Sequence, residues 1–229
     1  MADPKILLAD AALKLLAKSN WSDLTLMQVS RAARVEAGIL QGVSPNKPAL
    51  LGLILDWIGG EVAKRYQRDT ESEDARDRLL DVTLTWFEAL NAHKAAVRAL
   101  YDGLRRDPFT LVAARTEIIG AAEWLLTLAE ADTGPALPVR ALALGGVIAR
   151  AIPVWLEDDA AMTKTMARLD GDLRRATDLF GRLRRRRDDE TKRPPRSSAA
   201  AEKTARSKKV STAGTRRRSR ARNPARRRN

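Results

Sequence analysis

The stretch TLMQVSRAARVEAGILQGVSPNKPAL, residues 25–50, decides the fold of this chain. Thr25 and Gln28 stand three residues apart, as in a capping box, and predict the start of a short helix. A second short helix is expected over about residues 36–42, before Ser44-Pro45-Asn46 breaks the chain. Two such helices joined by a tight turn are typical of a helix-turn-helix unit, which places one helix in the DNA major groove. Generic packing of three helices gives the same spacing, so the pattern alone leaves both interpretations open.

Helical periodicity extends on both sides of this stretch, from residue 4 to about residue 183, without the alternation that marks strands. The sequence therefore predicts an all-α fold. Its expected domains are 1–65 (helix-turn-helix), 66–183 (a helical body) and 184–229 (a tail without regular structure). The other helices are expected at about 4–18, 46–66, 72–90, 92–106 and 109–131, around Ala141–Ala149, and after Asp158-Asp159.

Composition narrows the class of protein. The 229 residues include no cysteine, which excludes disulfides, thiol chemistry and cysteine-bound zinc. We expect no secretory signal at the N-terminus and no membrane-spanning segment, and hence a cytoplasmic protein.

The net charge of +13 is distributed unevenly along the chain. Residues 182–229 contain 20 Lys and Arg against four acidic residues, whereas the other 181 residues carry a net charge of −3. Large apolar residues nearly vanish after Leu183, so this segment cannot bury enough surface to offset its chain entropy. Its cation blocks, including Arg216, Arg217 and Arg218, favour sequence-independent contact with nucleic-acid phosphates. An anionic membrane surface, or no fixed partner at all, is the alternative.

The N-terminal segment resembles the TetR family of transcriptional regulators over about residues 5–55. The resemblance rests on Leu8–Leu13, on Thr25–Val35 and on Gly38, Leu40, Pro45, Lys47 and Leu50, which hold one register without a gap. It implies a DNA-binding helix-turn-helix followed by a helical domain for ligand binding and dimerisation. Two features depart from the family: Arg34 stands where a turn glycine is usual, and Gln41 and Ser44 replace an aromatic pair.

The candidate DNA-binding residues follow from this resemblance and from side-chain chemistry. The Gln41 amide presents the donor and acceptor that adenine matches. Phosphate neutralisation is assigned to Arg31, Arg34 and Lys47, the last of which stands at the family's backbone-contact position. Thr25 and Gly38 complete the set. The alternative is that all of these are ordinary solvated surface residues.

In the body, four aromatic residues are candidates for the effector pocket that the resemblance implies, although aromatics at helical spacing also build ordinary cores. They are Trp86, Tyr101, Trp124 and Trp155. The small-residue helix and the final apolar stripe are expected to pack closely against other helices. The TetR resemblance implies that they form a homodimer interface, which two half-site readers with two-fold symmetry require, and packing within one chain is the alternative.

A second resemblance, to the ubiquinone-biosynthesis lipid-binding family of the same fold, concerns the C-terminal half. It rests on Leu144–Val147, Trp155–Asp158, Thr165 and Leu169-Asp170. It implies a lipid-binding accessory protein that no longer reads DNA, with an isoprenoid lipid as ligand and a membrane surface as partner. We retain it as the alternative function.

Catalysis has little support in the sequence. The single histidine, His93, stands at a charged helix start beside Lys94, and no glycine-rich phosphate loop occurs. Acidic pairs such as Asp158-Asp159 have no His or Cys companion and are interpreted as helix caps. We therefore expect no enzyme activity, no cofactor and no metal site.

Overall fold

The computed structural model describes residues 3–66, 74–131 and 136–192, with side chains as far as Arg182. Within these ranges every regular element is a helix. Residues 1–178 form one compact unit, and residues 179–229 form a second unit. Of the second unit, only the end of the last helix falls within the described ranges.

The first four helices are α1 (Pro4–Leu16), α2 (Leu26–Ala33), α3 (Ala37–Val43) and α4 (Lys47–Arg65). Of these, all but α3 begin at a side-chain cap that the sequence supplies. Asp3 accepts a hydrogen bond from the Lys5 backbone at 2.9 Å ahead of Pro4. The predicted capping box of Thr25 and Gln28 is confirmed: both reciprocal bonds form, at 2.8 and 3.3 Å.

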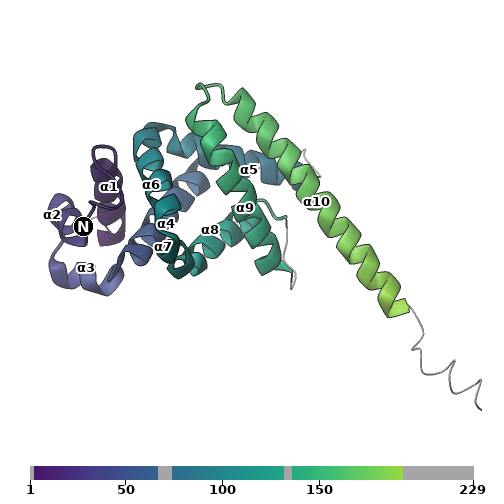
Figure 1. Ribbon diagram of the computed structural model, residues 1–229, viewed down its shortest axis with the longest axis horizontal. Helices are drawn as coiled ribbons and strands as arrows, with labels where there is room; N and C mark the ends of the chain where they lie inside the picture. The colour runs from purple at the N-terminus through teal and green to yellow at the C-terminus, as the bar shows by residue number, and fades with distance from the viewer. Residues whose placement is uncertain (1–2, 67–73, 132–135, 193–229) are drawn as a thin grey trace, which may run out of the picture. The chain divides into compact units, whose positions relative to one another are not determined.

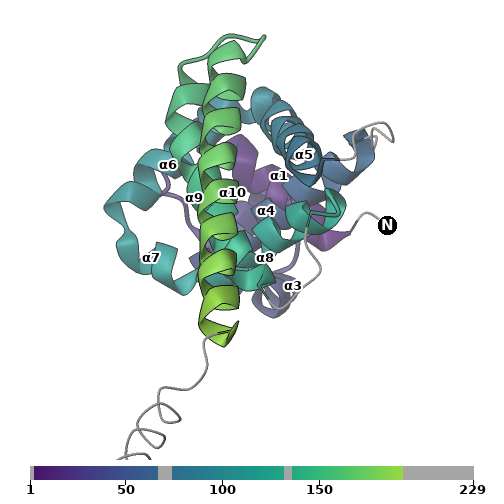
Figure 2. The ribbon, with the colours of Figure 1, turned by 90° about the vertical axis from the view of Figure 1, so that its right-hand side faces the viewer.

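The body consists of α5 (Ala75–Leu90), the 3-10 turn η1 (Asn91–His93), α6 (Lys94–Arg106), α7 (Pro108–Ala113), α8 (Arg115–Leu128), α9 (Leu137–Leu156) and α10 (Thr163–Lys192). In the first unit, α4 packs against α1, α5, α7 and α8, and α1 also contacts α6 (Figure 1). In the view of Figure 2, α4 lies between α5 and α6, with α8 below it. The helix-turn-helix therefore shares one continuous core with the body.

Two glycines let α4 and α8 approach closely. A Cβ on Gly52 would lie 2.8 Å from Cγ of Glu117, and one on Gly59 would lie 3.1 Å from the Trp124 ring. Gly59 follows Gly52 by seven residues on α4, and Trp124 follows Glu117 by seven residues on α8, so the two helices run in the same direction along this seam. The seam holds α4, which leads out of the helix-turn-helix, against the body.

Two predicted boundaries are wrong. The helix expected over 109–131 is two helices, α7 and α8, separated at Ala114, which is fully buried and has φ −90° and ψ 11°. The chain was expected to lose regular structure from Arg184, but α10 continues to Lys192. Arg has a high helix propensity, so the helix does not need its apolar stripe to continue. The expectation for residues 193–229 lies outside the described ranges.

α9 is the one described helix that is long and apolar enough to cross a membrane. Buried core helices share this composition, and six of its residues are buried inside the first unit: Ala141, Leu144, Val147, Ala151, Trp155 and Leu156. We therefore interpret α9 as a helix of the core.

Candidate DNA interface and effector cavity

The predicted two-helix unit forms, and its outer helix is open to solvent. α3 buries a single side chain, Leu40, which is 4% exposed. Val43, at the end of the helix, is half-buried against the core, and the other residues from Glu36 onward are exposed: Glu36, Ala37, Gly38, Ile39, Gln41 and Gly42. A helix held by Leu40 and Val43, with its outer side open, can lie against another molecule.

A left-handed residue closes the turn between α2 and α3. Arg34 has φ 54° and ψ 37°, the conformation that glycine adopts most readily. The buried Ser30 hydroxyl donates to the Val35 carbonyl at 2.7 Å, and the Val35 amide donates to the Ser30 carbonyl at 3.1 Å. Sequence analysis missed Ser30, although a Ser four residues before a turn residue is a signal for such a bond. These contacts hold the turn despite the strain at Arg34, which costs about 1–2 kcal/mol.

The predicted phosphate-binding cations differ in how they are held. Arg31 and Arg34 are exposed, and no ion pair to either is found within the described ranges. Lys47 turns inward instead: its ammonium donates to the Trp21 carbonyl at 2.6 Å and to the Ser22 carbonyl at 3.1 Å. It also lies 5.3 Å from the centre of the Trp21 ring. Lys47 therefore holds the α1–α2 loop to the start of α4 in this structure.

The outer face of α3 is small and carries no cation. A Cβ added at Gly38 or Gly42 would meet nothing within 4 Å, so the backbone there is accessible to a close partner. Gln41 is exposed on this face, while Glu36 places a carboxylate at the helix start. Thr25 is occupied by its capping bonds, and Arg216, Arg217 and Arg218 lie outside the described residues. Cations that attract DNA to this face must therefore lie outside α3, on α2 or elsewhere in the chain.

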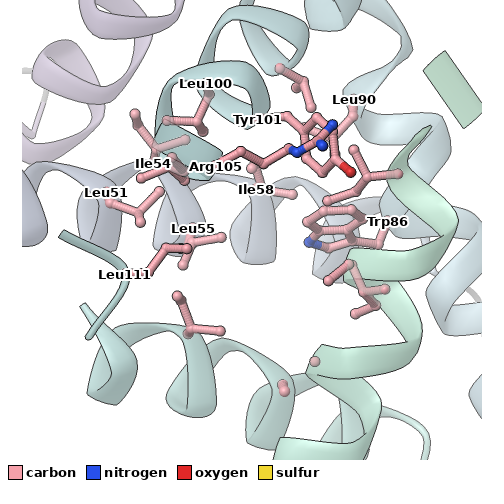
Figure 3. Close-up of a pocket in the computed structure, with 18 of the residues that line it drawn as sticks. Leu51, Ile54, Leu55, Ile58, Trp86, Leu90, Leu100, Tyr101, Arg105 and Leu111 are labelled. Carbon is pink, nitrogen blue, oxygen red and sulfur yellow. The ribbon is translucent and has the colours of Figure 1, made fainter. Parts of the chain in front are cut away.

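A cavity of about 370 Å³ lies where α1 and α4 meet the body helices α5 to α9 (Figure 3). Its wall is almost wholly apolar, and its deep residues are nearly completely buried, among them Leu13, Ile54, Ile58 and Leu90. The size and composition are those of a small-molecule site.

Two of the four predicted pocket aromatics line this cavity and two do not. Trp86 and Tyr101 contribute to its wall. Trp155 is fully buried elsewhere, where its indole donates to Asn91 at 3.1 Å and its ring packs on Phe87. Trp124 is 45% exposed, and its indole reaches the Gly59 carbonyl at 3.4 Å. Arg105, which sequence analysis did not single out, lines the cavity four residues after Tyr101. The four-residue spacing from Tyr101, which places both side chains on one face of a helix, was the sequence signal for Arg105.

The outer surface of α9 and α10 presents large apolar side chains to solvent. Val139, Leu142 and Met166 are 58%, 65% and 47% exposed. Gly146 and Ala149 are also exposed, and they are small enough to admit a partner helix closely. Apolar residues left uncovered on neighbouring helices are typical of a protein–protein contact.

His93 lies edge-on to the Trp57 ring with 5.0 Å between ring centres, and burial lowers the pKa of its imidazole. Across the described residues, no group of three or more His, Cys, Asp and Glu side chains is placed to hold a metal ion.

Comparison with known proteins places the fold. The sequence matches no family model and no curated protein. The structure is similar to that of a TetR transcriptional regulator from Nitrosomonas europaea, with a TM-score of 0.56 at 15% identity, covering 77% of this chain and 99% of that one. It is also similar to a TetR transcriptional regulator from Rhodococcus sp. RHA1, with a TM-score of 0.54 at 15% identity, covering 74% and 93%. The predicted all-α, TetR-like architecture is therefore confirmed: the chain has the fold of the TetR transcriptional regulators.

Proposed function

We propose that this chain is a cytoplasmic DNA-binding transcription regulator that reads DNA with α3. The observation that carries the proposal is the exposure of the outer side of α3, opposite Leu40 and Val43, within a unit whose turn is fixed by Ser30 and Val35. A recognition helix must be rigidly oriented and still free to enter the major groove. The solved structures with this fold are described as transcriptional regulators, which supports the same function here.

The DNA contact combines a small reading face with cations placed around it. Gln41 reads an adenine edge, and Gly38 lets the helix backbone approach the groove. Arg31 and Arg34 neutralise phosphates beside the groove. Because α3 has no cation of its own, the basic segment of residues 193–229 supplies most of the nonspecific, salt-dependent affinity. The tail thus keeps a weak reader near DNA and raises its effective concentration.

A two-fold dimer through the outer surface of α9 and α10 presents two such readers to a palindromic site. Its support is the exposed Val139, Leu142 and Met166 beside Gly146 and Ala149. The cavity in the body accepts a small apolar effector, for which the support is its size and its apolar wall.

The decisive experiment selects duplexes from a random library with the full chain, with a chain ending at Lys192 and with Gln41→Ala in both. We expect the shortened chain to bind more weakly than the full chain, yet to enrich an inverted repeat. Gln41→Ala is expected to lose the preference at one adenine in each half-site while nonspecific affinity stays constant. If the shortened chain enriches no sequence even at low salt, the regulator function fails.

The apolar cavity also fits the alternative of a lipid-binding accessory protein that has given up DNA binding. That protein would co-purify with an apolar ligand, associate with liposomes through residues 1–192 and enrich no duplex. Absence of flotation with liposomes, together with sequence enrichment, decides for the regulator.

A further inference from the structure

The cavity in the body combines an apolar interior with a single charged side chain. Of all the residues in its wall, only Arg105 carries a charge, and no Asp or Glu is among them. Arg105 is also exposed to solvent, whereas Leu13, Ile54 and Leu90 at the interior are 1% exposed. A residue that both lines a cavity and contacts solvent stands at its mouth. The site therefore has a charged mouth and an apolar interior.

The Arg105 guanidinium has no carboxylate partner within the described residues. It lies over the Tyr101 ring, with 5.5 Å between the guanidinium carbon and the ring centre. Figure 3 shows the Arg105 side chain extending along Tyr101 at one wall of the cavity, above Trp86. Stacking on an aromatic face leaves the edge N–H groups of a guanidinium free to donate. The Tyr101 hydroxyl, one helical turn before Arg105, adds a donor beside them.

We propose that this site binds a single-chain amphiphile with an anionic head, a carboxylate of the fatty-acid class. Two N–H groups of Arg105 receive the carboxylate at the mouth, since a guanidinium fork matches the two oxygens of that group. The alkyl chain occupies the interior between α1, α4 and α5. This inference rests on the proposed function, because it names the class of effector that the regulator senses.

The cavity volume limits the length of the chain. A dry apolar cavity of about 150 Å³ holds benzene, so simple scaling gives the 370 Å³ here room for roughly fifteen non-hydrogen atoms. Dodecanoate, with fourteen such atoms, is the probe of matching size. A cationic head would be repelled by Arg105, and a neutral alcohol would leave the guanidinium without its partner.

The test measures binding of dodecanoate, 1-dodecanol and dodecylamine to the full chain by calorimetry, each below its micelle concentration. We expect dodecanoate to bind at least about tenfold more tightly than dodecanol, and dodecylamine to bind more weakly than either. Arg105→Gln should reduce dodecanoate affinity about tenfold and leave dodecanol unchanged, while Arg105→Lys should restore part of the loss. Arg106→Gln removes an equal charge from the neighbouring exposed position outside the cavity and should change nothing.

Equal affinities for dodecanoate and dodecanol would overturn the proposal. So would equal losses from Arg105→Gln and Arg106→Gln, because such a result assigns the binding to general positive charge on the chain. Duplex selection with the same preparation separates this inference from the proposed function. Selection of a DNA site without dodecanoate binding refutes the ligand alone, and dodecanoate binding without DNA selection refutes the regulator alone.

Discussion

Gly103, in the last turns of α6, lies against Trp21 in the loop between α1 and α2. A Cβ at residue 103 would stand 2.3 Å from Cβ of Trp21 and 3.0 Å from Cγ. The first of these atoms is bonded to the backbone, and Trp21 is itself 1% exposed, so the tryptophan cannot swing away. Gly103→Ala therefore forces α6 and the loop apart.

The size of the effect is the difference between two contributions. Overpacking of this kind costs about 1–3 kcal/mol. Replacing a helical glycine by alanine returns about 1 kcal/mol of helix propensity. The difference is a net loss of about 0–2 kcal/mol, and a loss of about 1 kcal/mol, the middle of this range, lowers Tm by roughly 2–4 °C for a domain of this size.

Gly60 on α4 provides the matched control, because a Cβ there would meet nothing within 4 Å and the residue is exposed. Gly60→Ala keeps the propensity gain without the clash, so it should raise Tm by roughly 2–4 °C for a gain of about 1 kcal/mol. Thermal unfolding of both variants, followed by far-ultraviolet circular dichroism, checks the pair. If Gly103→Ala raises Tm as much as Gly60→Ala does, the close contact between α6 and Trp21 is refuted.

Three further predictions concern the turn, the start of α4 and the single histidine. Arg34→Gly should stabilise the chain by about 0.5 kcal/mol in urea unfolding, because the relief of left-handed strain exceeds the entropy that glycine adds to the unfolded chain. The same change should weaken duplex binding, because it removes a cation. A loss of stability would contradict the observed turn. Lys47→Met should destabilise by about 1 kcal/mol in the same assay, since two carbonyls in the Trp21 loop lose their donor, and an unchanged midpoint would show that these bonds contribute nothing. Burial lowers the pKa of His93 below 6.5, so the unfolded chain takes up this proton first and the free energy of unfolding should fall as pH drops below about 6.5. Plotted against pH from 7.5 to 5.5, the urea midpoint should fall less steeply for His93→Gln than for the parent chain. An identical pH dependence would refute the assignment.

Local signals in the sequence predicted the helix starts and several ends correctly. Asp3-Pro4 and the Thr25–Gln28 box lie where α1 and α2 begin, and α6 stops just before Asp107-Pro108. Each signal acts within four residues of the boundary it sets, so no tertiary information is needed. The same locality explains why the two-helix unit could be predicted from residues 25–50 alone.

Features set by distant contacts were not predictable in this way. The break at Ala114 has no Gly or Pro to announce it; it occurs where a fully buried alanine packs inside the unit. Lys47 could not be assigned to Trp21 from sequence, because its partner lies 26 residues away. Trp124 and Trp155 are alike as sequence signals, but their environments differ: Trp124 donates to the Gly59 carbonyl, and Trp155 donates to the Asn91 side chain.

The orientation of α3 is a property of the whole first unit. With seven residues, α3 is too short to be stable alone, and Leu40 is its only buried side chain. What orients it is a chain of contacts: Lys47 at the start of α4 holds the Trp21 loop, and Trp21 in turn packs against Gly103 of α6. Since the face of α3 that we propose to meet DNA carries no cation, its affinity for DNA should depend on geometry more than on charge. A substitution such as Gly103→Ala, which touches neither α2 nor α3, is for that reason expected to weaken sequence-selective binding more than nonspecific binding.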